Sequence, residues 1–382
     1  MRNLLKLLIS LLFVWLITAA QAATIRVGPL EHINRIADAA QQAQDGDTIE
    51  IMPGEYRGDV AVWLQKKLTI RGIGQRPVLI ADGKIAEGKA IWVLRKGDFV
   101  IENIEFRGAR ADDSNGAGIR LEKGKLLLNN CSFLDNQMGL LTANFLETEL
   151  SIENSLFAQA PRQMDSLPHL LYVGKIKSFS LRGSRFHGGF RGHLVKSRAR
   201  VNDIRYNLLY DGPNGEASYE LNLPNGGDAT LIGNIIGQSE KTQNFVVVSY
   251  GEEGHVWPDS RLTLIHNTLL SERKMGGWFL RVADKKFADP PRVYAANNLT
   301  VGLGLFSLLT NGEFHGNLPL VHSLLTAPEA LDFQISSTVP SFITRNLAYS
   351  LPEEWKPNAE FMFPIGTRPL APRSFWQPGA VQ

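Results

Sequence analysis

Residues 116–133 read GAGIRLEKGKLLLNNCSF. This stretch consists of short β-prone apolar runs separated by glycine and asparagine, and it contains no helical period of useful length. It ends in an asparagine that is followed, three positions later, by a large apolar residue. The same ending recurs as NIEF at 103, NCSF at 130, NSLF at 154, NLLY at 207, NTLL at 267 and NLTV at 298, with GSRF at 183 and NIIG at 234 as degenerate copies.

These copies start 24 to 33 residues apart, a period that suits one supersecondary unit per turn of a solenoid. Three short strands per turn, stacked in register, predict an all-β, single-stranded parallel β-helix. Leucine-rich repeats do not fit, because their period and leucine spacing differ. We interpret the recurring asparagine as an internal ladder between stacked turns, and we expect inward side chains such as Ile119, Leu121, Val195, Leu221 and Leu223.

Both ends of such a solenoid need covering, because the terminal coils would otherwise expose core and strand edges. Residues 32–44, HINRIADAAQQAQ, place apolar side chains on one helical face and predict an N-terminal capping helix. Residues 351–382 hold six of the 19 prolines, so we expect an extended tail packed on the last coils. The solenoid domain is then expected over residues 23–350.

The N-terminus predicts export. Residues 1–22 combine Arg2 and Lys6 with an apolar run and a small-residue cleavage site, as a signal peptide does. Without them the chain has 38 basic and 38 acidic residues, which implies no general attraction to nucleic acid. No later stretch is long and apolar enough to span a membrane. We therefore expect a periplasmic or secreted monomer with a single cysteine, Cys131, and no disulfide.

Several segments resemble a known group of proteins. The stretches ADAAQQAQ (37–44), DGDTIEIMPGEY (45–56), LTIRGIG (68–74) and NGAGIR (115–120) are similar to the entry coils of pectate-lyase-like right-handed parallel β-helix proteins. The resemblance extends over roughly residues 24–301 and implies a right-handed coil. It leaves function open, because this fold carries lyases, hydrolases, epimerases, phage tailspikes and adhesins.

Charge is unevenly distributed in the middle of the chain. Residues 171–210 contain nine basic residues against one acid, whereas residues 211–260 contain eight acids against one lysine. In HLVKSRARV (193–201), strand alternation with Val195 inward sends Lys196, Arg198 and Arg200 outward. A basic surface of this kind suits an acidic polysaccharide, and the alternative is a ladder of exposed salt bridges between coils.

The same counting extends the outward strip to neighbouring coils. We expect Glu220 and Asn222 beside Lys196 and Arg198, with Arg120 and Tyr172 on earlier coils and Tyr250 and Arg281 on later ones. These side chains would bind the sugar chain. Tyr172 and His193 are the candidate proton donors.

Two motifs suggest chemistry. LVKS (194–197) resembles chondroitinase-B-like and alginate lyases, which implies that Lys196 is the base, although Glu220 and Asn222 stand where an arginine is expected on the next coil. SYGEEGH (249–255) is partly similar to a mannuronan epimerase motif and adds His255. A noncatalytic carbohydrate-binding or envelope-assembly protein using the same face is the other alternative.

No cofactor is required by these residues, and a calcium ion is one option. The acids that would hold it are Glu252, Glu253 and Asp259, or Asp211 with Glu216, because calcium takes six to eight oxygen ligands. Neither group has the ordered spacing of a calcium loop. The histidines lack the short paired spacing of a zinc site.

Overall fold

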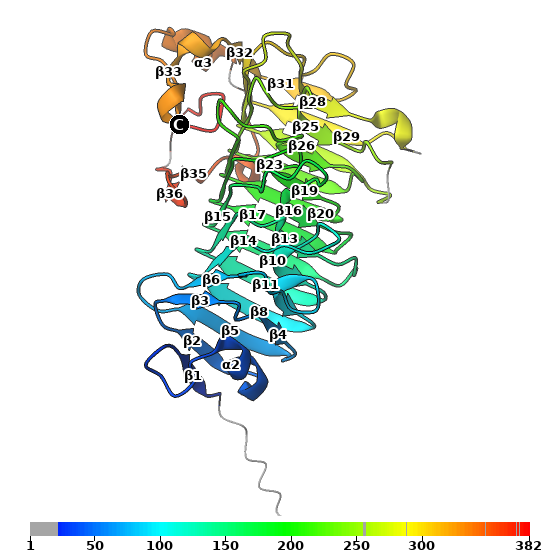
Figure 1. Ribbon diagram of the computed structural model, residues 1–382. Helices are drawn as coiled ribbons and strands as arrows, with labels where there is room; N and C mark the ends of the chain where they lie inside the picture. The colour runs from blue at the N-terminus through cyan, green and yellow to red at the C-terminus, as the bar shows by residue number, and fades with distance from the viewer. Residues whose placement is uncertain (1–21, 255–256, 288, 348, 372, 374) are drawn as a thin grey trace, which may run out of the picture.

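The computed structural model describes residues 22–254, 257–287, 289–347, 349–371, 373 and 375–382. Three parallel sheets run the length of the molecule, and consecutive strands of the chain pass from one sheet to the next (Figure 1). The chain is thus a parallel β-helix with three strands per turn, as expected. The predicted signal segment, residues 1–22, falls almost wholly outside the described residues.

The first sheet, sheet A, contains twelve strands: β1 (Thr24–Val27), β2 (Thr48–Ile51), β5 (Lys67–Gly72), β8 (Gly97–Glu102), β11 (Gly124–Asn129), β14 (Glu149–Glu153), β17 (Ser178–Arg182), β20 (Val201–Arg205), β23 (Asp228–Ile232), β26 (Arg261–Ile265), β29 (Arg292–Ala296) and β31 (Glu313–His315). Sheet B contains eleven: β3 (Glu55–Arg57), β6 (Val78–Ile80), β9 (Glu105–Arg107), β12 (Ser132–Leu134), β15 (Leu156–Ala158), β18 (Arg185–His187), β21 (Leu208–Tyr210), β24 (Ile235–Gln238), β27 (Thr268–Ser271), β30 (Leu299–Gly302) and β32 (Leu318–Leu320).

Sheet C contains nine strands: β4 (Ala61–Trp63), β7 (Ala90–Leu94), β10 (Ala117–Leu121), β13 (Met138–Thr142), β16 (His169–Val173), β19 (Val195–Ser197), β22 (Leu221–Leu223), β25 (Val246–Tyr250) and β28 (Trp278–Val282). Each strand pairs with its equivalent on the next coil, so side chains at one position form a column along the molecule. All five predicted inward residues on sheet C are fully buried, which confirms the pattern.

Aromatic side chains stack inside the early coils. Phe106, Phe133, Phe157 and Phe186 occupy the same register position on successive strands of sheet B. Their ring centroids lie 5.0, 4.5 and 4.6 Å apart in that order, with nearly parallel planes. Such pairs contribute about 0.5–1.5 kcal/mol each beyond the burial of their area.

The recurring asparagines occupy two adjacent columns, so the single ladder that we expected is wrong in register. Asn103, Asn130 and Asn154 lie at a corner with φ of 55°, 53° and 47°, a left-handed conformation that asparagine tolerates. In later coils the asparagine lies one position further on, inside the coil, where each bonds the next in the order Asn207, Asn234, Asn267, Asn298 and Asn317. Both positions favour asparagine, which conceals the offset in the sequence.

The capping helix forms as expected but is shorter than residues 32–44. Helix α2 (Ile36–Gln42) buries Ile36, Ala39 and Ala40 against the first coils. Its first N–H groups have no intrahelical partner. The Asp59 carboxylate, which comes from the next coil, accepts hydrogen bonds from the backbone nitrogens of Ile36 and Ala37 at 2.6 and 3.0 Å.

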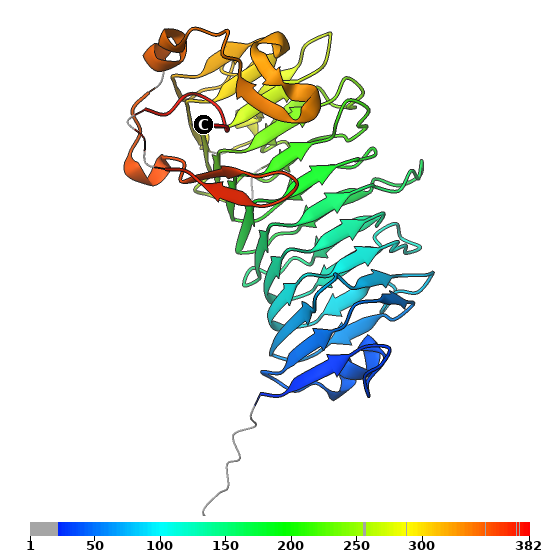
Figure 2. The ribbon, with the colours of Figure 1, turned by 90° about the vertical axis from the view of Figure 1, so that its left-hand side faces the viewer.

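The parallel coils end at β32, before the boundary expected at residue 350. Beyond it lie an antiparallel pair, β33 (Leu325–Ala327) and β34 (Asp332–Ile335), and helix α3 (Ser341–Leu347). The tail contains a second hairpin, β35 (Ala359–Phe361) and β36 (Thr367–Pro369), and it runs back along one side of the solenoid (Figure 2). Backbone nitrogens of the tail bond Gly183 at 2.7 Å and Asn297 at 2.8 Å, so the tail spans several coils.

Among the described residues, no helix reaches the length and apolarity that a membrane crossing requires.

Candidate functional site on the outer face of sheet C

One outward column of sheet C gathers the predicted polar residues, and we name it the sheet C strip. Register pairing places its members on consecutive coils in the order Arg120, Leu141, Tyr172, Lys196, Asn222, Ser249 and Arg281. Adjacent strands lie about 4.8 Å apart, so the strip extends for ~29 Å. The register confirms the expected alignment of Arg120, Tyr172, Lys196 and Asn222.

The centre of the strip is a compact group of charges. The carboxylate of Glu253 accepts from Lys196 Nζ at 3.0 Å and from Arg198 Nη2 at 2.5 Å. Arg198 Nε also donates to the hydroxyl of Tyr172 at 3.0 Å, and its Nη1 donates to Asn225 at 2.6 Å. Lys196 Nζ lies 5.4 Å from the centroid of the Tyr172 ring.

Burial of this group is unequal. The side chains of Lys196 and Arg198 are only 12% and 14% exposed, whereas that of Glu253 is 45% exposed. Partial burial opposes ionisation of Glu253, yet the hydrogen bonds and charges of Lys196 and Arg198 hold its pKa below the usual value. Lys196 and Arg198 are thus two largely buried cations, and both bind the solvent-accessible carboxylate of Glu253.

Two imidazoles lie beside these cations. The rings of His169 and His193 are 4.6 Å apart, and the backbone N–H of His193 donates to His169 Nδ1 at 2.8 Å. Burial, followed by the charges of Lys196 and Arg198, lowers the pKa of His169 to about 3. Burial also lowers the pKa of His193 well below its usual value. Both rings are therefore neutral near pH 7.

His193 has an unsatisfied ring nitrogen. Its Nδ1 atom is buried and has no hydrogen-bond partner among the described residues. The His193 ring also packs edge-on against Tyr219, with ring centroids 5.0 Å apart. The ring is uncharged, and the burial that lowers its pKa opposes protonation.

Two predicted strip residues point inward instead. Glu220 is fully buried, and one of its carboxylate oxygens accepts a hydrogen bond from Thr242 at 3.2 Å. Tyr250 is also fully buried, and its hydroxyl donates to the carbonyl of Gly227 at 2.5 Å. Alternation explains Tyr250, because its neighbour Ser249 takes the outward position. Glu220 shares the parity of the outward Asn222 but precedes β22, which begins at Leu221, so the alternation of that strand does not govern it.

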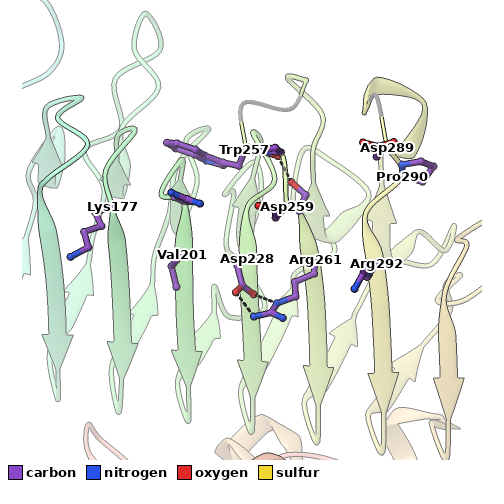
Figure 3. Close-up of a pocket in the computed structure, with 12 residues that line it drawn as sticks. Lys177, Val201, Asp228, Trp257, Asp259, Arg261, Asp289, Pro290 and Arg292 are labelled. Carbon is purple, nitrogen blue, oxygen red and sulfur yellow. Dashed lines mark hydrogen bonds and ion pairs between the residues drawn. The ribbon is translucent and has the colours of Figure 1, made fainter.

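Arg200 and His255 also stand apart from the strip. Arg200 lies at the corner before β20 and lines a cavity over sheet A, which Figure 3 shows. The prediction that it joins Lys196 on one face is wrong, because the strand ends at Ser197 and the alternation stops there. His255 lies outside the described residues. Arg120 remains on the strip and borders, with Tyr172, Asn144 and Asp113, a pocket of about 300 Å³.

The partners of Lys196 and Arg198 include residues that sequence reasoning did not assign to the site. Glu253 belongs to the SYGEEGH motif, but the sequence predicted it only as a calcium ligand. Asn225 and His169 carry no local sequence signal. Only the position of the loop after β25, which returns over β19, brings Glu253 to Lys196.

The acids proposed for calcium do not assemble into a metal site. No group of three or more His, Cys, Asp or Glu side chains among the described residues is placed to hold a metal ion. Glu253 is engaged by two cations. The carboxylate of Asp211 accepts hydrogen bonds from the backbone nitrogens of Gly189 and Ala217 at 2.5 and 2.9 Å. Both of its oxygens are therefore already bonded to backbone N–H groups.

Comparisons with known proteins bear on the fold. No protein-family model and no curated protein matches the sequence. Among solved structures, the chain is similar to pectate lyase Pel9A, with a TM-score of 0.56 and 14% identity over 95% of this chain and 97% of that one. The chain has the right-handed parallel β-helix fold. At this identity the likeness shows the fold alone.

Weaker likenesses exist to two further structures. They are a pectin methylesterase from Aspergillus niger, with a TM-score of 0.38 and 11% identity over 77% of this chain and 86% of that one, and ORF18 of Geobacillus virus E2, with 0.37 and 12% over 72% and 52%. At these scores neither adds to the argument.

Proposed function

We propose that this right-handed parallel β-helix protein binds an acidic, uronate-containing polysaccharide along the sheet C strip, with Lys196 and Arg198 at the centre. One observation carries the proposal: a carboxylate, that of Glu253, already lies between these two cations at 3.0 and 2.5 Å. The carboxylate of a uronate is the same chemical group. The fold shared with pectate lyase Pel9A supports a polysaccharide as the ligand.

Glu253 is suited to be displaced by such a ligand. It is nearly half exposed, so solvent and a competing carboxylate can reach its ion pairs. Lys196 and Arg198 are instead held in place by Tyr172 and Asn225 before any ligand arrives. An arriving uronate would therefore find the cations already positioned and would have to compete with Glu253.

The length of the strip supports a polymer in preference to a single sugar. Arg120 lies about three coils before Lys196 and Arg281 three coils after it. Arg281 and Arg120 are 49% and 23% exposed. Cations at the centre and near both ends of the strip suit several uronates of one chain.

The test is the affinity for polygalacturonate and alginate, measured by calorimetry with dextran as the neutral comparison. Lys196→Gln and Arg198→Gln should each weaken polyuronate binding about tenfold or more, the equivalent of one hydrogen bond to a charged group. Glu253→Gln should strengthen it, because the internal competitor is removed. Lys84→Gln, which changes an exposed lysine elsewhere, is the matched control. If all three site variants bind like the unaltered protein, the proposal is wrong.

Elimination chemistry is a second candidate function, and the unpaired Nδ1 atom of His193 favours it. In β-elimination a base removes the proton next to the uronate carboxylate, the electrons form a carbon–carbon double bond, and the glycosidic oxygen leaves with a proton. His193 is uncharged near pH 7 and would accept that proton only if the sugar chain reached its buried Nδ1 atom, whereas Lys196 is engaged by Glu253. For this second candidate we therefore propose His193, in place of Lys196, as the base.

Ultraviolet absorbance of the unsaturated product separates the two candidates. A rise that His193→Gln abolishes, with binding retained, would establish elimination. Unchanged absorbance with intact binding would leave the noncatalytic function. We also propose that residues 1–22 direct export to the periplasm or the medium, which N-terminal sequencing of the mature protein tests.

A further inference from the structure

A cavity of about 780 Å³ lies on another face of the solenoid, over sheet A. Its floor contains Val201, Asp228, Arg261 and Arg292, which share one register position on four successive coils. Three coil steps give the cavity a length of ~14 Å. Figure 3 shows this row, with the loops that carry Trp257 and Asp289 above the start of the strands.

Part of the charge around the cavity is already neutralised. Arg261 and Asp228 form two hydrogen bonds of 2.6 Å each. Lys177 bonds Glu149 at 2.6 Å. These pairs leave little net charge at the floor and at one end.

Four further charged side chains line the cavity, two positive and two negative, and they form no ion pairs with one another. Arg200 and Arg292 line the cavity as cations, and Asp259 and Asp289 line it as anions. None of the four forms an ion pair or a side-chain hydrogen bond with another described residue, and all four are exposed. Two free donors and two free acceptors therefore face the same space.

We propose that this cavity binds an uncharged saccharide. Guanidinium groups only donate hydrogen bonds and carboxylates only accept them, whereas each sugar hydroxyl does both. A hydroxyl-rich neutral ligand can satisfy Arg200, Arg292, Asp259 and Asp289 together. An anionic ligand would be repelled by the two aspartates, and a cationic one by the two arginines.

Shape and apolar surface agree with this ligand class. Trp257, Pro258 and Pro290 supply apolar lining beside the charged groups, as in sugar sites that combine an aromatic surface with a few polar groups. The indole of Trp257 is fixed, because its Nε1 donates to the carbonyl of Arg198 at 3.2 Å. A volume of this size falls in the range of ordinary ligand pockets.

The cavity is independent of the sheet C strip. It shares no lining side chain with the Lys196, Arg198 and Glu253 group. Arg198 and Arg200 are separated only by Ala199, yet they face different surfaces on either side of a coil corner. The proposal therefore does not rest on the proposed function of the strip.

The experiment titrates the full mature chain with short neutral oligosaccharides derived from glucan, xylan, mannan and galactan, and follows calorimetric heat and tryptophan fluorescence. Arg292→Gln and Asp259→Asn are the site variants. Both side chains are exposed, so folding should not depend on them. Arg35→Gln and Asp112→Asn are matched controls, because each removes an exposed charge of the same kind far from the cavity.

At least one neutral oligosaccharide should bind, and each site variant should weaken it about tenfold while leaving the affinity for polygalacturonate unchanged. Lys196→Gln should show the reverse pattern, which separates this proposal from that for the strip. The proposal is overturned if no neutral oligosaccharide of the panel binds. It is equally overturned if Arg292→Gln weakens and Asp259→Asn strengthens polygalacturonate binding, because the cavity would then belong to the path of an acidic chain.

Discussion

Glu220 and Glu253 belong to the same acidic block of the sequence, yet their surroundings shift their pKa values in opposite directions. Burial raises the pKa of Glu220 well above the usual value, and the nearby Asp211 carboxyl adds to that shift. The cations beside Glu253 lower its pKa despite partial burial. Glu220 is therefore a neutral core residue and Glu253 an ionised surface residue, which charge counting along the chain cannot distinguish.

Glu220 should make the protein less stable as pH rises. Its folded-state pKa exceeds the unfolded value of 4.5, so its stabilising contribution is complete below pH 4.5 and is lost as pH rises toward the folded-state pKa. Glu220→Gln should remove this component and flatten the dependence of the unfolding free energy on pH above 4.5. Urea unfolding at several pH values checks it, with the exposed Glu354→Gln as control. An unchanged slope in Glu220→Gln would contradict the assignment.

Phe157 illustrates the cost of a gap in the aromatic column. It is fully buried between Phe133 and Phe186, with centroid distances of 4.5 and 4.6 Å. Phe157→Ala should cost about 3–5 kcal/mol of unfolding free energy, because both stacking partners lose contacts and a cavity remains. Phe145→Ala, which truncates a ring that is 43% exposed, should stay within about 0.5 kcal/mol. Equal losses in the two variants would refute the role of the column.

Helix α2 depends on a residue outside itself. Its seven residues are too few for independent stability, and its N-cap residue, Arg35, makes no side-chain capping bond. Asp59 supplies the missing acceptors from the following coil. The helix is thus fixed to the solenoid by a carboxylate as well as by its buried apolar face.

Replacing that carboxylate tests the link. Asp59→Ala should lower the unfolding free energy by about 1–2 kcal/mol, because two N–H groups lose their acceptor. Asp59→Asn, which keeps one oxygen, should restore part of it. Thermal unfolding followed by circular dichroism distinguishes them. If Asn and Ala are equally destabilising, the capping bonds do not matter.

Over the whole molecule, the coil architecture was predictable from sequence because its signals repeat. Short β-prone runs, asparagines at 24- to 33-residue intervals and a helical N-terminal segment all point to one solution. Lys196 and Tyr172 were placed correctly because strand alternation and coil length locate them. The inward Tyr250 was misplaced by a single residue, since one step of register reverses the face of a strand. Glu220 was misplaced because it precedes β22, where the alternation of the strand does not apply.

The site itself was less predictable. Glu253 lies 57 positions after Lys196 and reaches it only because two coil-to-coil steps and a loop intervene. Asn225 lies at a coil corner after β22, where the chain has no period to count, and His169 is the first residue of β16. The face that a strand residue occupies can be derived from the alternation and the coil length. The contacts that a loop residue makes depend on the conformation of that loop, which the repeat does not determine.

The tail gives the two halves of the solenoid unequal protection. It bonds Gly183 and Asn297 and inserts Ala380, which donates to Thr268 at 2.9 Å. Coils before Gly183 rely on their neighbours and, at the N-terminal end, on helix α2. Hydrogen exchange should therefore be faster in β5, β8 and β11 than in β23, β26 and β29, and removal of residues 351–382 should abolish the difference. Uniform exchange in the full chain would contradict this.

The tail thereby acts as a brace on one end of a stack of rungs. A stack of this kind frays from its unbraced end, so heat or mechanical pulling should release the coils one after another from the N-terminus. The coils that carry Lys196, Glu253 and the cavity over sheet A lie within the braced span. The centre of the sheet C strip and the cavity over sheet A should consequently stay folded after the N-terminal coils have unfolded.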